Sequence, residues 1–289
     1  KTYRKMRKIP LDSPKFRTIE NININLHGNA CGVKFWNSQA ERFSKRPQLR
    51  WGNDWVLKLV SKFGVVSNSS RILEIGCGAG NYLSALAPMC REIVGCDFSD
   101  KMIFYAQKNA ERAGCKNASF IVADWREISP EQLGGPRAFD VSFSHMSVAA
   151  SKGEGFDKML ELTNDWLVWV QPFSRKDSIL DLLRVDVLNR ATPNLQDNFS
   201  YAFKTLSDLG IPPNLEFRTS VRTDSFNLDC GARFYIGRLS IEKPLSQKEK
   251  SKIRACLKSI AKDGKTESRL ETILCAMVWS RNGKHSIKI

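Results

Sequence analysis

The sequence lacks the features that mark membrane-spanning and exported proteins. None of its apolar runs approaches the roughly 18 residues that a membrane-spanning helix needs. The basic first residues, KTYRKMRKIP, contain no apolar segment that could act as a secretory signal. We therefore expect a soluble, cytoplasmic protein that has no membrane partner.

Histidine is scarce, and the cysteines are scattered. The eight cysteines form no C-x-x-C pair, and the three histidines, His27, His145 and His285, stand far apart in the sequence. Structural zinc sites usually combine cysteines and histidines at short, regular spacings. We expect no metal site, and we expect most of the cysteines to be small core residues.

Glycine is concentrated in residues 71–88, whose sequence is RILEIGCGAGNYLSALAP. An apolar run that contains Glu74 leads into Gly76, Gly78 and Gly80, and an apolar segment compatible with a helix follows. Glycines permit backbone angles that a Cβ forbids, and they let a ligand approach the main chain at the N-terminus of a helix. The pattern predicts a strand, a glycine turn and a helix. The turn either holds a nucleotide-like ligand or serves only as a tight connection.

The motif Glu-x-Gly-x-Gly-x-Gly, from Glu74 to Gly80, resembles the first motif of class I S-adenosylmethionine-dependent methyltransferases. The dinucleotide fingerprint G-x-G-x-x-G would instead need a glycine where Asn81 stands. The resemblance implies S-adenosyl-L-methionine as the cofactor, a ligand with a cationic amino-acid end and no pyrophosphate. The cofactor contacts that it implies in this turn are Glu74, Gly76, Cys77, Gly78 and Gly80.

Strand-like and helix-like segments alternate from residue 71 onward. Strands are expected at residues 92–97, 118–124, 139–144 and 166–171, and helices at residues 101–114 and 156–165. This alternation is typical of a parallel sheet with helices packed on it, in which ligands bind at the carboxyl ends of the strands. The fold class is therefore α/β.

Two further strand-like runs, at residues 215–224 and 270–280, are separated by helix-like segments. One of these segments opens with a predicted capping box of Ser246 and Glu249. The resemblance implies a Rossmann-like, seven-stranded, mostly parallel sheet with an antiparallel last strand. It also implies helices on both faces and a helical insertion before the last strand.

We expect a basic N-terminal arm at residues 1–34 and a single methyltransferase domain at residues 35–289. Within this domain, residues 35–66 are expected to form a helical cap. Residues 226–266 are expected to hold the helical insertion between strands six and seven. The resemblance implies that both the cap and the insertion lie over the ligand cleft.

The net charge of +15 is concentrated at the two ends of the chain. Residues 1–50 carry 12 Lys and Arg against 3 Asp and Glu, and residues 241–289 carry 12 against 5. Basic segments of this kind bind nucleic acid or acidic substrates in some proteins and only keep the protein in solution in others. Both interpretations of the basic ends stay open at this point.

Carboxylates are expected at the ends of the second and third strands. Asp97, 21 positions after Gly76, can accept hydrogen bonds from both hydroxyls of a ribose, although NAD-binding domains use an acid at the same place. The resemblance implies that Asp124, with Trp125, takes the adenine amino group and that Met102 packs on the base. The alternative is that Asp124 only caps a helix. The expected cofactor contacts of these segments and the fourth strand are Asp97, Phe98, Met102, Asp124, Trp125 and Ser144.

The fourth strand ends in FDVSFSHMSVA, where the resemblance places residues beside the transferring methyl group. The segment lacks the Asn/Asp-Pro-Pro-aromatic sequence of amino-methylating DNA and protein-glutamine enzymes, and the chain has no Pro-Cys dipeptide of the C5-cytosine DNA enzymes. His145 is the sole histidine of the predicted core, and its intrinsic pKa suits proton removal near neutral pH. We expect His145 to act as a general base or to position the substrate. A purely structural role is the alternative.

Substrate contacts are expected from the cap, from the ends of the fourth and fifth strands and from the insertion. If two or more arginines of these segments converge on the cleft, they favour an anionic acceptor, whereas arginines on a solvated face do not. The expected substrate contacts are Trp36, Met146, Gln171, Arg175, Arg233 and Tyr235, with Asp177 and Arg238 as further candidates.

These patterns together predict an S-adenosylmethionine-dependent methyltransferase that acts on a small-molecule acceptor. The overall sequence is loosely similar to those of the ubiquinone and menaquinone C-methyltransferases. The basic ends make an RNA methyltransferase the first alternative, although no RNA-binding module is recognisable. A catalytically silent protein that binds the cofactor or a partner is the second. The patterns leave the reacting atom of the acceptor and the oligomeric state open.

Overall fold

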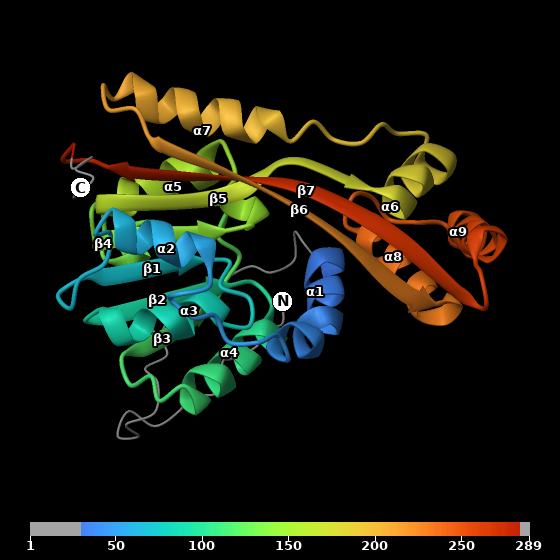
Figure 1. The fold of residues 1–289 in the computed structure, drawn as a ribbon, viewed down its shortest axis with the longest axis horizontal. Helices are drawn as coiled ribbons and strands as arrows, with labels where there is room; N and C mark the ends of the chain where they lie inside the picture. Colours follow the sequence, from blue (N-terminus) through green and yellow to red (C-terminus); the bar gives the residue numbers. More distant parts are fainter. Residues whose placement is uncertain (1–29, 284–289) are drawn as a thin grey trace, which may run out of the picture.

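The computed structural model describes residues 30–283, which form a seven-stranded sheet with helices on both faces (Figure 1). The strand order is β3-β2-β1-β4-β5-β7-β6. Strands β1 to β5 run parallel, and β7 is antiparallel to both of its neighbours. This arrangement confirms the predicted fold class. The strands are β1 (Arg71–Ile75), β2 (Glu92–Asp97), β3 (Ala118–Val122), β4 (Phe139–His145), β5 (Thr163–Asp177), β6 (Asn214–Asn227) and β7 (Lys265–Ser280).

Helices follow most of the strands and cover both faces of the sheet. They are α1 (Ala30–Ser44), α2 (Trp55–Lys62), α3 (Asn81–Leu86), α4 (Asp100–Arg112), α5 (Glu154–Leu162), α6 (Ser178–Leu183), α7 (Gln196–Asp208), α8 (Leu228–Ser240) and α9 (Gln247–Ile260). Ile72, Phe143 and Val170 face the side that α2, α3 and α4 cover, whereas Leu73 and Trp169 face the side of α5 and α7. Strands buried on both faces read as continuous apolar runs, which is why β1 to β4 were visible in the sequence.

Serine caps start α4 and α9, and the cap at Ser246 is the one predicted above. The Ser99 hydroxyl accepts a hydrogen bond from the Met102 N–H at 3.0 Å. Ser246 Oγ accepts one from the Glu249 N–H at 3.2 Å, and the Glu249 carboxylate accepts one from the Ser246 N–H at 2.8 Å. Gly114, with a φ of +71°, follows the end of α4 as expected. These contacts satisfy N–H groups that a helix start leaves unpaired.

Strands β5, β6 and β7 extend beyond the segments predicted for them and form a long ribbon (Figure 1). The β6–β7 pairing runs from Asn214↔Val278 to Asn227↔Lys265. The added segments are rich in polar and charged residues, so no apolar run marked them in the sequence. Hydrogen bonds between the strands and a separate apolar core among α6, α8 and α9 stabilise this end of the molecule.

The extension corrects the expected position of three candidate residues. The sequence predicts Gln171 at the end of the fifth strand and Arg175 and Asp177 in the segment after it, whereas all three lie within β5. α6 follows directly, and the Asp177 carboxylate accepts hydrogen bonds from the Ile179 and Leu180 N–H groups at its start. Arg175 and Asp177 are therefore held by a paired strand rather than by a loop.

The ends of the expected cap and insertion can be compared with the observed helices. α1 begins at Ala30 rather than at residue 35, and the basic arm before Ala30 lies outside the described residues. α8 and α9 lie between β6 and β7, in the segment expected to hold the insertion. In the described part of the chain, no helix combines the length and the apolar character that crossing a membrane requires.

Candidate cofactor and acceptor site

The glycine turn between β1 and α3 is enclosed on two sides and open on a third. Gly76 has a φ of +71°, and a Cβ on it would lie 2.5 Å from the Ser147 side chain. Gly80 has a φ of +77°, and a Cβ on it would lie 3.0 Å from the Ala106 Cβ. Gly78 has φ of +53°, and a Cβ on it would meet no atom of the described chain within 4 Å. The backbone at Gly78 is therefore the place where a ligand can approach the turn.

Glu74, on β1, has a buried carboxylate with one unsatisfied oxygen. The residue is 2% exposed and accepts a hydrogen bond from the Leu83 backbone N–H, but Oε2 has no partner among residues 30–283. Burial, with a smaller effect of the charge on Asp97, raises the pKa of Glu74 to about 8. A cationic ligand group would pair with the orphaned oxygen and restore the ionised carboxylate. This corner fits the amino-acid end of S-adenosylmethionine.

Asp97, at the end of β2, is ordered by the glycine turn. Its two carboxylate oxygens accept hydrogen bonds from the Gly78 and Ser99 N–H groups, each at 2.9 Å. Burial raises the pKa of Asp97 to about 6, and these two hydrogen bonds oppose the rise. An ionised carboxylate has about four acceptor positions, so Asp97 can still accept two hydroxyl donors. Phe98, next in the chain, is half-buried.

Asp124 and Trp125, after β3, are both held by other parts of the protein. Arg126 contacts Asp124 through Nη2 at 2.5 Å from Oδ2 and through Nε at 3.0 Å from Oδ1. Burial alone would raise the pKa of Asp124, but the hydrogen bonds from Arg126 outweigh it and lower the pKa. Trp125 is 3% exposed and donates its indole N–H to the Gly155 carbonyl at 2.9 Å. Asp124 retains acceptor positions for a ligand amino group, whereas Trp125 is part of the core.

Helix α1 is tied to the start of α4 by one asparagine. The Asn37 side-chain oxygen accepts a hydrogen bond from Ser99 Oγ at 2.6 Å, and its amide nitrogen donates to Asp100 Oδ1 at 2.7 Å. Ser99 also donates its N–H to Asp97. α1 is therefore fixed to the same segment that orders the Asp97 carboxylate.

An apolar cluster lies under α1 beside the glycine turn. Ala40 of α1, Ala79 of the turn and Met102 of α4 are buried together, and Trp36 and Phe43 pack against them. The Trp36 and Phe43 rings lie 5.7 Å apart, edge to face. Met102 is 2% exposed, so it joins the two helices next to the turn rather than presenting a free surface.

The carboxyl end of β4 carries Ser144 and His145. Ser144 is fully buried, and its hydroxyl has no partner in the described part of the chain. The half-buried His145 ring lies 4.6 Å from the Tyr82 ring. Burial, and then the positive charges of Arg46 and Arg175, lower the pKa of His145 to about 4. His145 is therefore neutral at neutral pH and able to accept a hydrogen bond, although it is a weak base.

The turn after β4 is pinned against the glycine turn. Met146 has φ of +60°, which is uncommon for a residue with a side chain, and its N–H donates to the Val170 carbonyl at 2.7 Å. Gln171 is 2% exposed and donates its side-chain N–H to the Ser147 carbonyl at 2.7 Å. Because Ser147 also approaches Gly76 closely, Gln171 fixes the distance between the two turns. The Met146 side chain is 38% exposed beside His145.

Not every expected substrate residue lies at this end of the sheet. Arg233 is exposed on α8, where its guanidinium lies 3.2 Å from the Cys230 sulfur. Tyr235 is 1% exposed, inside the apolar core of α6, α8 and α9. Tyr82, whose ring lies beside His145, and Arg46, whose charge lowers the pKa of His145, were not singled out in the sequence. Tyr82 carried a local signal, since it lies two residues after the glycine motif, whereas Arg46 carried none.

The cysteines fill the core as expected. Five of the eight are buried, and Cys77 of the glycine turn is 6% exposed. Burial raises the pKa of the Cys77 thiol well above its usual range, so the thiol stays protonated. Within residues 30–283, no group of three or more His, Cys, Asp or Glu lies together as a metal site requires.

Comparison with known proteins places this site in a family. Residues 67–206 match a family model described as a methyltransferase domain. A segment of 66 residues is 41% identical to the 23S rRNA (uracil(1939)-C(5))-methyltransferase RlmD of Xanthomonas axonopodis pv. citri, covering 23% of this chain and 14% of that protein. A segment of 94 residues is 32% identical to an uncharacterized RNA methyltransferase of Caldanaerobacter subterraneus, covering 32% of this chain and 20% of that protein. The chain thus spans a fifth or less of the length of these two curated relatives.

Among solved structures, a SAM-dependent methyltransferase of Thiobacillus denitrificans in complex with S-adenosyl-L-homocysteine has a TM-score of 0.46 and 16% sequence identity, over 85% of this chain and 97% of that chain. The family match over residues 67–206 includes the glycine turn, Asp97, Asp124 and the end of β4. With the sheet order and the Glu74-to-Gly80 motif, this match identifies the region as a class I methyltransferase domain, whose cofactor is S-adenosylmethionine.

Proposed function

We propose that the protein transfers the methyl group of S-adenosylmethionine to a small-molecule acceptor at the carboxyl end of β4. The observation that carries the proposal is the close approach of two turns. A Cβ on Gly76 would lie only 2.5 Å from the side chain of Ser147, which follows β4. The turn that fits the cofactor therefore lies directly beside the end of β4, where the acceptor would bind. The expected cytoplasmic location remains part of this proposal.

Three carboxylates would hold the cofactor. The orphaned oxygen of Glu74 suits its cationic amino-acid end, Asp97 suits its ribose hydroxyls, and Asp124 suits its adenine amino group. When bound, the cofactor supplies an electrophilic methyl group on a sulfonium. The protein's task is then to align the nucleophile with that methyl group and to exclude water.

The residues around β4 have separate tasks in this proposal. α1, held by Asn37, excludes water from the glycine turn. His145, with a pKa of about 4, is better suited to accepting a hydrogen bond from the acceptor than to removing a proton from a weak acid. Gln171 keeps the turn after β4 in position. We therefore assign His145 a substrate-positioning role.

The packing of α1 against α8 supports a small acceptor. The rings of Phe35 on α1 and Phe234 on α8 lie 5.8 Å apart, and a Cβ on Gly237 of α8 would lie 2.8 Å from the Phe35 ring. The two helices thus meet closely, whereas a polymer needs an open groove. Arg46 and Arg175, whose charges lower the pKa of His145, favour an acceptor that carries a negative charge.

The proposal is tested by following a labelled methyl group. The protein is incubated with methyl-labelled S-adenosylmethionine and either a filtered small-molecule extract or the total RNA of its source organism. We expect label in a small molecule and slower transfer by His145→Ala. Label in RNA alone would contradict the small-molecule proposal. Absence of transfer to both, with S-adenosylhomocysteine still bound, would support a catalytically silent protein.

An RNA acceptor is the second candidate, because a specific finding favours it. The two relatives described above are named RNA methyltransferases, and the chain carries a net charge of +15. This candidate predicts an affinity for tRNA or rRNA that falls steeply as the salt concentration rises. Failure to bind RNA even at low salt would remove it.

A further inference from the structure

A shift in the pairing register of β5 places Arg175 on the same face of the sheet as His145. In β5, Val170 pairs with Ala276 of β7, and after a register shift Arg175 pairs with Thr272. Ala276 and Thr272 are an even number of residues apart, so Val170 and Arg175 belong to the same face of the sheet. Val170 is also the partner of His145 in β4. Arg175 and His145 therefore share this face.

Other arginines crowd the same region. Arg222 of β6 and Asp177 of β5 both pair with Leu270 of β7, two residues from the partner of Arg175, so Arg222 belongs to this face as well. Burial, and then the charges of Arg238 on α8 and of Arg222, lower the pKa of Arg175 to about 10. Burial is also the main cause that lowers the pKa of Arg238. Like charges thus gather in a partly dehydrated space.

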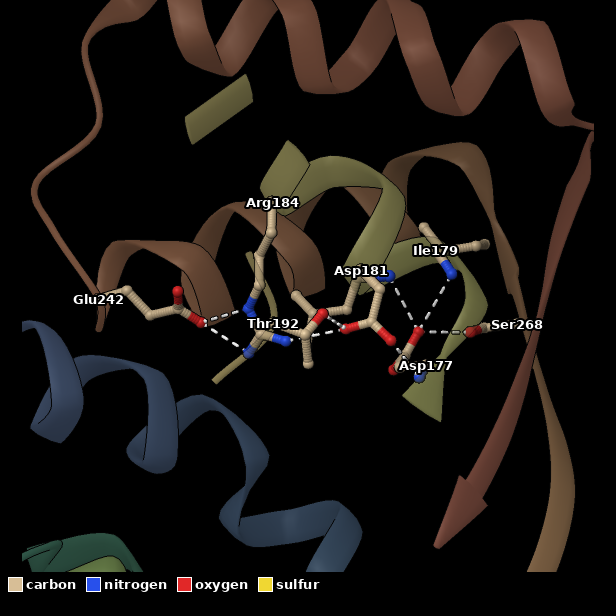
Figure 2. Close-up of polar contacts among 8 residues, drawn as sticks. Asp177, Ile179, Asp181, Arg184, Thr192, Glu242 and Ser268 are labelled. Atoms are coloured by element: carbon tan, nitrogen blue, oxygen red, sulfur yellow. Dashed lines mark hydrogen bonds and ion pairs between the residues drawn. The ribbon is translucent and has the colours of Figure 1, made fainter. Parts of the chain in front are cut away.

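The guanidinium groups of Arg175 and Arg238 have no direct ion pair in the described part of the chain, although the charge of Asp177 acts on both of them and that of Glu242 acts on Arg238. Nε of Arg175 is buried without a hydrogen-bond partner, and neither arginine forms an ion pair with a carboxylate of residues 30–283. Arg184, in contrast, lies 3.0 Å from Asp181 and 2.8 Å from Glu242 (Figure 2). A dehydrated guanidinium without a partner is costly, and a bound anion would remove that cost.

The carboxylates nearest to these arginines are already engaged. Asp177 accepts hydrogen bonds from Ser268 Oγ at 2.6 Å and from the Leu180 N–H at 2.9 Å, and Figure 2 shows it turned towards Ser268. Asp224 pairs with Arg222 at 3.2 Å. Asp177, Asp181, Asp224 and Glu242 equal the four arginines of this region in number, but each of them has a partner other than Arg175 and Arg238.

We infer that Arg175 and Arg238 form a subsite for an anionic group of the methyl acceptor, a carboxylate or a phosphate. Guanidinium groups bind both by paired, charge-assisted hydrogen bonds. The assignment to the acceptor rests on the proposed function, whereas binding of the anion does not. Because Arg175 shares a face with His145, an anion held here directs the rest of the acceptor towards the end of β4.

The test is isothermal titration calorimetry of the full-length protein with inorganic phosphate and, separately, with succinate. The two ligands distinguish a site for phosphate from a site for carboxylate. We expect the wild type to bind at least one of them. Arg175→Gln and Arg238→Gln should each weaken that binding roughly tenfold or more. The control is Arg269→Gln, which removes an exposed arginine from the opposite face of the ribbon, where it pairs with Glu271 at 2.8 Å. This variant should bind as the wild type does.

Binding of S-adenosylhomocysteine by the same variants separates the possible outcomes. Retained binding shows that Arg175→Gln and Arg238→Gln are folded, so that their loss of anion binding is local. No anion binding by the wild type, or equal binding by all four proteins, would overturn the subsite. Anion binding that depends on Arg175, without any binding of S-adenosylhomocysteine, would contradict the proposed function and leave the subsite standing.

Discussion

Glu74 and Asp97 are buried carboxylates for which the protein supplies too few partners. Oε2 of Glu74 has no hydrogen-bond partner within residues 30–283, and Asp97 uses only two of its acceptor positions, on the N–H groups of Gly78 and Ser99. An unsatisfied buried group costs about 1–3 kcal/mol. Groups kept in this state are typical of ligand sites rather than of stable cores.

Replacing Glu74 by Gln should change how stability depends on pH. The pKa of Glu74 is raised from 4.5 to about 8, so between these values the folded protein holds a proton that the unfolded chain has released. The stabilisation of the folded protein by protonated Glu74 is complete below pH 4.5. Above pH 4.5 this contribution to the unfolding free energy falls by at most about 1.4 kcal/mol per pH unit, and it is lost once the pH passes about 8.

Urea denaturation of the cofactor-free protein measures this effect. The unfolding free energy of the wild type minus that of Glu74→Gln should decrease steadily from about pH 5 to about pH 8. A difference that stays constant across this range would show that Glu74 is ionised in the folded protein.

Two glycine substitutions in the same turn should have different consequences. Alanine at Gly76 or Gly78 must adopt a positive φ, at a cost of about 1–2 kcal/mol. Gly76→Ala also drives a Cβ into Ser147, so it should destabilise the protein more than Gly78→Ala does. Gly78→Ala should instead mainly weaken binding of S-adenosylhomocysteine, because its Cβ enters the open side of the turn. Equal losses of stability in urea would contradict this difference.

At the scale of secondary structure, the elements predicted correctly are those with a local signal. β2 was predicted at its observed bounds because it is an apolar run buried on both faces. The Ser246 capping box fixed the start of α9 within four residues of sequence. The end of β5 had no such signal, because its pairing depends on residues of β7 about a hundred positions later.

Arg175 and Arg238 were candidates in the sequence, but their gathering with Arg222 could not be predicted, for the same reason. Arg175 and Arg222 share a face only through the register of β5 and β6 on β7. The charge of Arg46 acts on His145 although the two residues lie about a hundred positions apart in the sequence. Trp125 shows a second limit of local sequence signals. From the sequence, a tryptophan after a strand that contacts a ligand cannot be distinguished from one whose side chain is buried in the core, as that of Trp125 is.

Loosening α1 should weaken cofactor binding without unfolding the sheet. Asn37→Ala removes the hydrogen bonds to Ser99 and Asp100, each of which contributes about 0.5–1.5 kcal/mol. Hydrogen exchange should show faster opening of α1, and calorimetry should show weaker binding of S-adenosylhomocysteine. The control, Gln39→Ala, removes an amide whose hydrogen bond is with the neighbouring Ser38. Unchanged exchange of α1 in Asn37→Ala would show that apolar packing alone holds the helix.

Across the whole molecule, the family match covers the proposed cofactor contacts and only part of the proposed acceptor contacts. The glycine turn, Asp97, Asp124 and His145 lie within residues 67–206, which match the methyltransferase family. Arg46, Arg222 and Arg238 and the helices that carry or flank them lie outside that match. The family match therefore supports the methyl donor, whereas the acceptor contacts that we propose at Arg46, Arg222 and Arg238 have no support from it.

Calorimetry with S-adenosylhomocysteine tests the central claim, that the glycine turn and Asp97 hold the methyl donor. We expect binding in the micromolar range, weakened roughly tenfold or more in Asp97→Ala. Binding should be unchanged in Asp208→Asn, which alters an exposed carboxylate at the end of α7. Binding of NAD(H) with none of S-adenosylhomocysteine, or equal affinity in Asp97→Ala, would contradict the claim.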